Sequence, residues 1–264
     1  LPRDPVDRDP EQIETWAKAH GLDAVVSTDG DADRPLLADE AGTIIPGDLL
    51  GQITSVTLGA ETVVTPVSAN SGCEAGQRFA RVIRTRIGSP HVIEGMQRAG
   101  GKVVGYEPNG GYLLGFEAKG PAGAIAPLWT RDCFLPLIVT LSRARGRPLS
   151  RLVAEEPGGV TRASLLRPAP LEASTRLVHR LRDDAEARRN FLEQFGGTLS
   201  AMNLTDGVRM TLVGGNVVHV RPSGNAPELR LYVEAGNAAR AEKMLQAGLA
   251  ALRSALERSD SDLE

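Results

Sequence analysis

The chain has 264 residues, of which 41% are hydrophobic and 24% are charged, and this composition is that of an ordinary globular protein. Its 30 basic and 33 acidic residues leave a net charge of −3 and form no basic block, so a nucleic-acid partner is not expected. No apolar run reaches the roughly 18 residues of a membrane span, and no membrane partner or signal peptide is expected. The partner is therefore expected to be a small molecule, and the length favours about two domains.

The cysteines and the first residues bear on the compartment and on the extent of the chain. Cys73 and Cys133 lie far apart, without a second cysteine or a histidine at the spacing of a zinc site. We therefore expect reduced core thiols in a cytoplasmic protein rather than a disulfide or a zinc site. The chain starts at Leu1 and is rich in proline and charge up to Pro10, which is typical of a cut inside a longer protein.

The first half of the chain alternates between helical and strand patterns. A helix is expected over residues 10–20, capped by Asp4 or Asp9 and ended by Gly21, followed by a strand over 22–27. Further helices are expected over 48–58, around 73–79 and from 89 to 100, and strands over 62–66, 81–84, 102–106 and 112–116. Such alternation predicts a sheet covered by helices.

A helix over residues 130–145 completes this part, with Phe134, Leu137, Ile138 and Leu141 expected on its inner side. Charge, proline and glycine then gather at residues 147–148 and 155–159, which indicates a linker. After it we expect a helix over 175–195, a hairpin of strands 207–213 and 217–220, a strand over 228–234 and a helix over 238–257.

Three carboxylates follow the strand over 22–27 at every second position. Asp29, Asp31 and Asp33 would repel one another if a loop folded them together, and a divalent cation relieves that repulsion most simply. An all-oxygen ligand set favours Mg2+ over Zn2+. Arg34 would then be free to reach a phosphate. A calcium EF-hand is excluded because its sixth position, which needs glycine, would be Arg34, and because a strand precedes the loop.

A second stretch with chemical character runs over residues 221–230 and has the sequence RPSGNAPELR. Arg221 and Arg230 offer planar donors to a phosphate, Ser223 and Asn225 can fill its remaining oxygens, and Gly224 frees the backbone to approach a ligand. Arg230 alternates with two leucines, so its side chain is expected on the face opposite the core. The alternative is a hairpin loop with solvated arginines.

Two further stretches lie between these. In residues 107–111, Glu107 can accept and Asn109 can donate hydrogen bonds to neighbouring sugar hydroxyls, although Pro-Asn-Gly is by itself a turn signal. In residues 85–92, Arg86 and the amides of the helix that begins at Ser89 favour a phosphate. His91 is either a surface histidine or a proton shuttle.

In this order the four stretches resemble the metal loop, closing loop, sugar loop and phosphate loop of the alpha-D-phosphohexomutases, the phosphomannomutase and phosphoglucomutase family. Residues 221–228 match the RPSGNAPE phosphate loop of that family, and residues 107–110 have the E-x-N-G form of a loop that is E-x-S-G in other members. Many members have a different residue at the position of His91. A strand that ends in Asp-x-Asp also resembles the haloacid-dehalogenase-type phosphotransferases, with Asp29 as nucleophile, but that alternative leaves the other loops unexplained.

The resemblance implies an enzyme that interconverts hexose 1- and 6-phosphates of glucose or mannose through a phosphoserine and a bisphosphorylated sugar. It implies Mg2+ on Asp29, Asp31 and Asp33. Substrate contacts would come from the following residues: Arg34, Arg86, Glu107, Asn109, Arg221, Ser223, Gly224, Asn225 and Arg230. Arg34 and His91 remain possible catalytic residues. The serine loop lies in the family's first domain, and nothing like it occurs in this sequence.

The resemblance also implies a division into three parts. Residues 1–43 would be the end of the second domain with the metal loop, 44–153 the α/β third domain and 154–264 a smaller α+β fourth domain with an antiparallel sheet. The overall class is α/β. We expect the carboxyl-terminal part of a mutase that is inactive without its amino-terminal domains; the alternative is a short phosphosugar-binding protein without catalysis. An orphaned helix and strand at the start favour the first, because they would expose a sheet edge.

Overall fold

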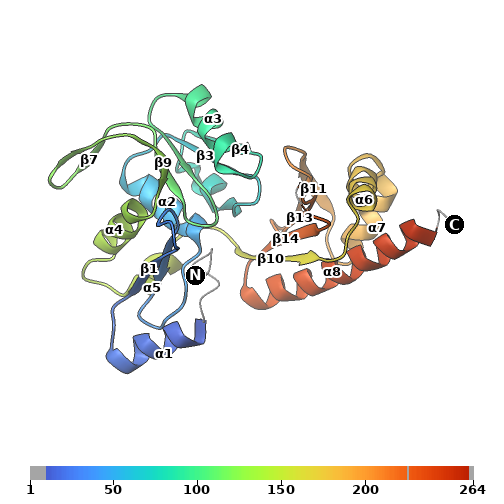
Figure 1. Ribbon diagram of the computed structural model, residues 1–264, viewed down its shortest axis with the longest axis horizontal. Coiled ribbons are helices and arrows are strands. Elements are labelled where there is room, and N and C mark those ends of the chain that lie inside the picture. Colours follow the sequence, from blue (N-terminus) through green and yellow to red (C-terminus); the bar gives the residue numbers. More distant parts are fainter. Residues whose placement is uncertain (1–9, 225, 262–264) are drawn as a thin grey trace. The chain divides into compact units, whose positions relative to one another are not determined.

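The computed structural model describes residues 10–224 and 226–261, so the predicted caps at Asp4 and Asp9 lie outside the described residues. Figure 1 shows the chain, which forms two compact units that divide between Gly158 and Gly159. Both are built from helices and sheets, which confirms the predicted mixed α/β class. Among the described helices, none combines the length and the apolar character that crossing a membrane requires.

The first unit begins with helix α1 (Pro10–His20) and the antiparallel pair β1 (Val25–Thr28) and β2 (Pro35–Ala38). The helix matches its prediction, and β1 is shorter than the predicted strand over 22–27. β2 was not predicted because all four of its residues are buried, so it lacks the alternation that marks a half-buried strand. Leu36 and Ala38 pack with Ile13 of α1, whereas Leu37 packs toward the rest of the unit.

The central sheet of this unit has the strand order β4-β3-β5-β6-β9. Its strands are β3 (Thr62–Pro66), β4 (Arg81–Thr85), β5 (Val103–Tyr106), β6 (Tyr112–Leu114) and β9 (Leu128–Asp132). β3 pairs in parallel with β4 and β5. β6 pairs antiparallel with β5, and β9 pairs antiparallel with β6. Helix α3 (Ser89–Ala99) covers one face through Val92 and Met96. Helix α2 (Gly47–Thr57) covers the other face, and helix α4 (Phe134–Arg143) packs against α2.

Two predicted helices of this unit differ from the structure. The segment around 73–79 is the short 3-10 element η2 (Ser71–Gln77), which Ala75 and Gly76 interrupt with non-helical angles. The helix predicted over 130–145 begins only at Phe134, because the residues before it form β9. The Asp132 carboxylate accepts a 2.8 Å hydrogen bond from the backbone N–H of Phe134, the first residue of the helix.

The predicted inner side of α4 was wrong in part. Phe134 and Ile138 are each 60% exposed and Leu141 is also exposed, whereas Leu137 is buried as predicted. The buried side also includes Pro136 and Thr140. The helix has two apolar sides, and α2 packs on only one of them.

Three further elements of the first unit were not predicted. Strands β7 (Ala118–Gly120) and β8 (Gly123–Ile125) form a small separate hairpin, and α5 (Leu149–Ala154) lies in the predicted linker region. The Glu40 carboxylate accepts hydrogen bonds from the backbone N–H, at 3.2 Å, and the hydroxyl of Ser150 at the start of α5. This contact ties the end of the β1–β2 hairpin to the rest of the unit. Cys73 and Cys133 are both buried thiols.

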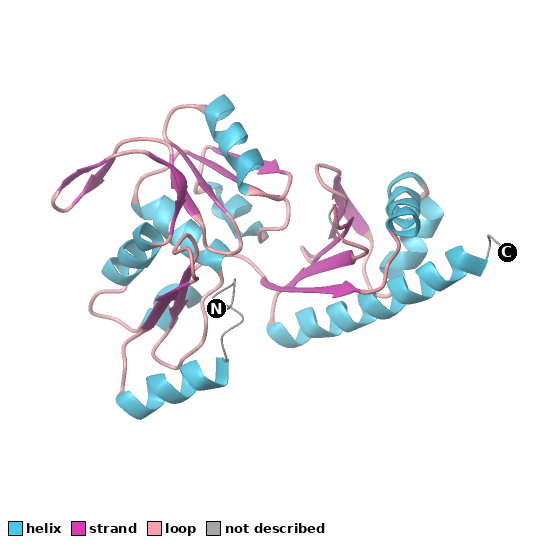
Figure 2. Cartoon of the chain, in the orientation of Figure 1, coloured by secondary structure: helices cyan, strands magenta, loops and turns pink. Residues whose placement is uncertain are grey.

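The second unit is an antiparallel sheet in the order β10-β14-β13-β12-β11. Its strands are β10 (Val160–Leu166), β11 (Leu199–Asn203), β12 (Val208–Leu212), β13 (Val217–Pro222) and β14 (Leu229–Ala235). Figure 2 colours these strands magenta and the helices of the unit cyan: α6 (Leu171–Asp183), α7 (Ala185–Glu193) and α8 (Ala238–Ser261). The predicted hairpin is confirmed as β12–β13, but β10 and β11 were missed.

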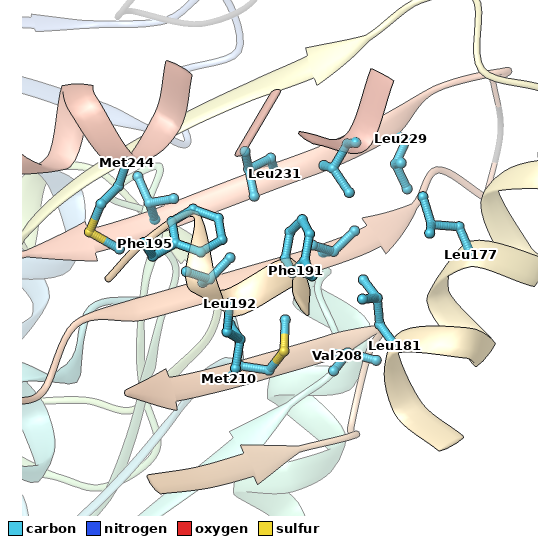
Figure 3. Packing of buried hydrophobic residues seen from close by; sticks show 14 of the residues in the cluster. Leu177, Leu181, Phe191, Leu192, Phe195, Val208, Met210, Leu229, Leu231 and Met244 are labelled. Carbon is cyan, nitrogen blue, oxygen red and sulfur yellow. The ribbon is translucent and has the colours of Figure 1, made fainter. Parts of the chain in front are cut away.

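The core of this unit lies between the sheet and its helices. Met210 and Leu231 from the strands meet Phe191, Phe195 and Met244 from the helical layer (Figure 3). The helix predicted over 175–195 is two helices, because Asp184 leaves the helical conformation between them. Its carboxylate accepts hydrogen bonds from the backbone N–H groups of residues 186 and 187 and so caps α7.

Candidate functional site

The acidic loop, residues 29–34, joins β1 to β2. The Asp29 N–H donates to the Arg34 carbonyl at 3.2 Å, and the Ala32 N–H donates to the Asp29 carbonyl at 3.2 Å, so the hairpin closes the loop tightly. Ala32 sits at the tip with φ +57°, a left-handed conformation that is uncommon for any residue but glycine. Such a compact turn explains how alternate residues come to point to the same place.

The carboxylates of Asp29, Asp31 and Asp33 converge, with one oxygen from each lying within 4.8 Å of the others. Asp29 is buried, Asp33 is half-buried and Asp31 is exposed. Oδ1 of Asp29 accepts from the backbone N–H groups of Asp33 at 3.2 Å and Arg34 at 3.3 Å, which fixes the buried carboxylate at the base of the loop.

Arg34 neutralises part of this charge. Its Nε lies 2.5 Å from Oδ2 of Asp29 and 3.3 Å from Oδ1 of Asp33. Burial would raise the pKa of the Asp29 carboxyl, but the backbone amide and the guanidinium of Arg34 outweigh burial and hold this pKa below its ordinary value. Asp29 is therefore a carboxylate at neutral pH, as a metal ligand must be.

The donor set fits Mg2+. Within the described part of the chain, Oδ2 of Asp29 and Oδ1 of Asp33 are buried and have no hydrogen-bond partner beyond their ion pairs with Arg34. Buried oxygens with open lone pairs, next to an exposed carboxylate on Asp31, are hard ligands that can share the cation with water.

Glu107 and Asn109 lie in the tight turn between β5 and β6. The Gly110 N–H donates to the Glu107 carbonyl at 2.9 Å, and the Glu107 N–H donates to the Gly111 carbonyl at 3.1 Å. Oδ1 of Asn109 accepts from the Gly111 N–H at 3.0 Å, which fixes the amide. Gly110 has φ +90° and packs so closely on Pro35 that a Cβ would lie 2.7 Å from its ring. The turn therefore lies directly beside the acidic loop.

Two residues that the sequence did not single out reach Glu107. The Ser89 hydroxyl, at the start of α3, donates to Oε2 of Glu107 at 2.9 Å. Arg131, near the end of β9, forms a close ion pair with Asp33 and lies 3.9 Å from the same oxygen of Glu107. The position of Ser89 at the start of a helix in the predicted closing loop could have indicated a role for it. Arg131 belongs to no motif, and its position follows only from the strand pairing.

Arg86 and His91 line a different part of the unit. They border a groove of about 430 Å3 between β4 and α3, together with Arg81 and Arg98. Arg86 is exposed and His91 is half-buried. Of the residues in the predicted closing loop, 85–92, it is thus Ser89 that contacts the turn of residues 107–111, the sugar turn.

The second unit brings Arg221 and Arg230 together. Arg221 near the end of β13 pairs in register with Arg230 on β14, so the two face each other on adjacent strands. Asp206 lies 3.5 Å from Nε of Arg221, and Glu228 lies 3.3 Å from Arg230. Two like charges opposite each other repel, and a bound anion would relieve that repulsion as these carboxylates do in part.

The loop between β13 and β14 lies between the two arginines in the sequence. Ser223 is buried, and its N–H donates to the Glu228 carbonyl at 2.8 Å. Gly224 is exposed, and no atom lies within 4 Å of the position that a Cβ would take. Asn225 falls outside the described residues. The described part of the loop is thus open to a ligand on the Gly224 side.

His219 lies on β13, two residues before Arg221. Its Nε2 is 2.6 Å from the backbone carbonyl of Asp206, and its ring stacks on Tyr232 at a centroid distance of 5.2 Å. Burial lowers the pKa of His219 to about 4, so the imidazole is neutral and donates to this carbonyl. His219 thereby anchors the turn whose carboxylate faces Arg221.

Comparison with known proteins places this geometry in a family. Residues 38–158 match the model of the phosphoglucomutase/phosphomannomutase alpha/beta/alpha domain III, and residues 174–250 match the C-terminal domain of the same family. A phosphomannomutase of Sinorhizobium fredii is 42% identical over 250 residues, which are 92% of this chain and 52% of that protein.

Solved structures agree at the level of the fold. A phosphoglucomutase/phosphomannomutase family protein of Burkholderia thailandensis superimposes with a TM-score of 0.69 at 19% identity, covering 96% of this chain and 51% of that one. N-acetylphosphoglucosamine mutase of Aspergillus fumigatus, in complex with GlcNAc-6P and magnesium, gives a TM-score of 0.60 at 17% identity, covering 89% and 49%.

The chain belongs to the phosphoglucomutase/phosphomannomutase family, the alpha-D-phosphohexomutases. These matches confirm the family resemblance that the four loops indicated, and they exclude the haloacid-dehalogenase alternative. The chain spans about half the length of the relatives it matches.

Proposed function

We propose that this chain is the carboxyl-terminal part of a mutase that interconverts hexose 1-phosphate and hexose 6-phosphate through a phosphoserine and a bisphosphorylated sugar. The observation that carries the proposal is the contact between the acidic loop and the sugar turn, which Arg131 bridges and Pro35 packs together. A cation site beside hydroxyl-binding groups suits phosphoryl transfer to a sugar, in which the protein positions the reactants and stabilises charge.

In this proposal Asp29, Asp31 and Asp33 hold Mg2+, which when bound supplies positive charge to the phosphoryl group in transfer. Arg34 already pairs with this loop and contributes a fixed positive charge beside it. Glu107 accepts hydrogen bonds from sugar hydroxyls, and Asn109 binds next to it. Since both are set by the tight turn, they can define where the sugar ring lies.

Arg221 and Arg230 bind the phosphate that is not being transferred, with Ser223, Gly224 and Asn225 around it. Their fixed opposition across two strands favours a group with several oxygens over a single acceptor. Arg86 is proposed as a further phosphate contact, His91 as a candidate for moving a proton, and Arg34 as a possible catalytic residue that stabilises negative charge. Hexose phosphates of glucose or mannose are the proposed ligands, and the amino-terminal domains of the family are the proposed partners.

The division of the family's domains over this chain belongs to the same proposal: residues 1–43 from the second domain, 44–153 as the third and 154–264 as the fourth. We also propose a cytoplasmic location.

The proposal is tested by a coupled assay for hexose 1- and 6-phosphate interconversion. This sequence contains no serine loop of the family type, and a two-step transfer needs the covalent carrier, so the purified chain should give no turnover. Adding the amino-terminal half of a related mutase in trans should restore activity, and Asp31→Asn should reduce it. Turnover by the chain alone would show that the nucleophile is assigned to the wrong part of the protein.

A further inference from the structure

Arg131 links two loops that are far apart in the sequence. It lies on β9, the strand that pairs with β6, and β6 begins directly after the sugar turn. From there its guanidinium forms a close ion pair with Asp33 of the acidic loop, and Nη1 lies 3.9 Å from Oε2 of Glu107. One side chain therefore touches the proposed cation site and stands within reach of the proposed sugar site.

The backbone at Gly111 leaves room for the side chain of Arg131. A Cβ at Gly111 would lie 2.7 Å from Cδ of Arg131 and 3.3 Å from Oδ1 of Asn109. The side chain of Arg131 thus crosses the sugar turn where glycine allows it, and it remains about 30% exposed. The position is held by packing on the turn as well as by charge.

The ion pair uses the carboxylate of Asp33, which is one of the three proposed cation ligands. Arg34 already takes Asp29 and Oδ1 of Asp33, and Arg131 takes Oδ2 of Asp33. A guanidinium does not lose its proton in a protein, so Arg131 can give up Asp33 only by moving. The carboxylate of Glu107 is a second acidic acceptor within 4 Å, and a shift on the order of 1 Å would bring the 3.9 Å separation to hydrogen-bond distance.

We propose that Arg131 couples the two loops: it competes with the cation for Asp33 and passes to Glu107 when the cation takes Asp33. This inference rests on the proposed Mg2+ site. It makes Arg131 a positioning residue that lowers the cation affinity of the acidic loop and changes the charge that Glu107 presents to a sugar. Because coupling is reciprocal, Glu107 must in turn affect cation binding through Arg131.

The test is calorimetric titration of Mg2+ into the whole chain and its variants at low ionic strength. Arg131→Gln should bind Mg2+ about fivefold more tightly than the unmodified chain, since a partly exposed competing ion pair is removed. Arg98→Gln is the matched control, because it removes the same charge from an exposed helix position in the same unit. Its affinity should stay within about twofold of the unmodified chain.

A double-mutant cycle with Glu107→Gln tests the transfer itself. In the unmodified background Glu107→Gln should weaken Mg2+ binding, because Arg131 loses its second partner. In the Arg131→Gln background the effect should be smaller by about twofold or more. The transfer can also be followed with Arg131 left in place. The side-chain Nε–H resonance of Arg131 should shift when Mg2+ is added, and this shift should differ between the unmodified chain and Glu107→Gln.

The outcomes separate the inference from the proposed function. Unchanged or weaker Mg2+ binding in Arg131→Gln, with binding lost in Asp31→Asn, overturns the role of Arg131 and leaves the cation site standing. An equal gain in Arg98→Gln also overturns it, since the effect would then be one of net charge. No binding to any variant, Arg131→Gln included, overturns the cation site and the inference together.

Discussion

Protonation of His219 should make the second unit less stable as the pH falls from 7 to 5. His219 is 1% exposed, and burial holds its pKa at about 4, against an ordinary value of 6.5. Because the folded value is the lower one, the unfolded chain takes up the proton first. The stabilisation is complete above pH 6.5 and is lost as the pH falls toward 4.

The size of the effect follows from the two pKa values. A difference of about 2.5 pKa units corresponds to about 3 kcal/mol once the pH is below both values. Between pH 7 and pH 5 about 2 kcal/mol of this should be lost, which is a large share of the stability of a domain. His219→Gln removes the titrating group and keeps a donor for the Asp206 carbonyl. Between pH 7 and pH 5 the free energy of unfolding of this variant should therefore fall by about 2 kcal/mol less than that of the unmodified chain.

Urea unfolding at both pH values, followed by the methyl resonances of Met210 and Leu231 in the core of the unit, measures the change. His179 on α6 is exposed, so His179→Gln should behave like the unmodified chain. Carboxylates that titrate in the same range cancel in these comparisons. Equal losses in the unmodified chain and in His219→Gln would refute the reasoning, and so would a loss abolished by His179→Gln.

Three further predictions concern the two loops. Arg221→Ala should weaken glucose 1-phosphate binding by about 1.5 to 3 kcal/mol in calorimetry, and Arg221→Lys should recover only part because lysine lacks the planar fork; equal affinity for all three proteins would remove Arg221 from the site. Asp31→Asn should abolish the heat of Mg2+ binding, and traces identical to those of the unmodified chain would remove the acidic loop from it. Ala32→Val should lower the free energy of unfolding by about 1 to 2 kcal/mol in urea, because a β-branched residue resists φ +57°, whereas Ala32→Gly should change it by less than about 1 kcal/mol; equal effects would contradict the left-handed turn.

Local signals predicted much of the fold and part of the candidate site. The helix over 10–20 was predictable from its ends, and the β12–β13 hairpin from its glycine turn. The convergence of three alternate carboxylates after a strand needed only the expectation that a loop would fold them together. These features depend on residues within a few positions of one another, which a single sequence displays.

The wrong or missing predictions concern elements whose type or buried side depends on the segments that pack against them. β2 is buried throughout and shows no alternation, so neither strand nor helix is indicated. In α4 the spacing of Phe134 and Ile138 suits an inner side, but α2 packs against the side that carries Leu137. Asp184 splits a continuous helical pattern because its side chain can cap a new helix.

Contacts between distant segments could not be predicted from spacing. Arg131 meets Asp33 only because β9 pairs with β6 beside the sugar turn, and the sequence around Arg131 carries no motif. Asp206 lies close to Arg221 because β12 pairs with β13, which places the turn before β12 next to the end of β13. The sequence therefore indicated the loops that we propose to bind ligands, but not the ion pairs that Arg131 and Asp206 form beside them.

The central claim is that the second unit recognises the phosphate common to different hexose phosphates. The most direct measurement follows the backbone amide resonances of Ser223, Gly224 and Ala226 while glucose 1-phosphate, mannose 1-phosphate or inorganic phosphate is added. We predict that all three ligands shift these resonances, that the shifts vanish in Arg221→Ala, and that they persist in Arg162→Ala, which alters an exposed arginine on β10. Shifts centred elsewhere, or none at millimolar ligand, would contradict the account.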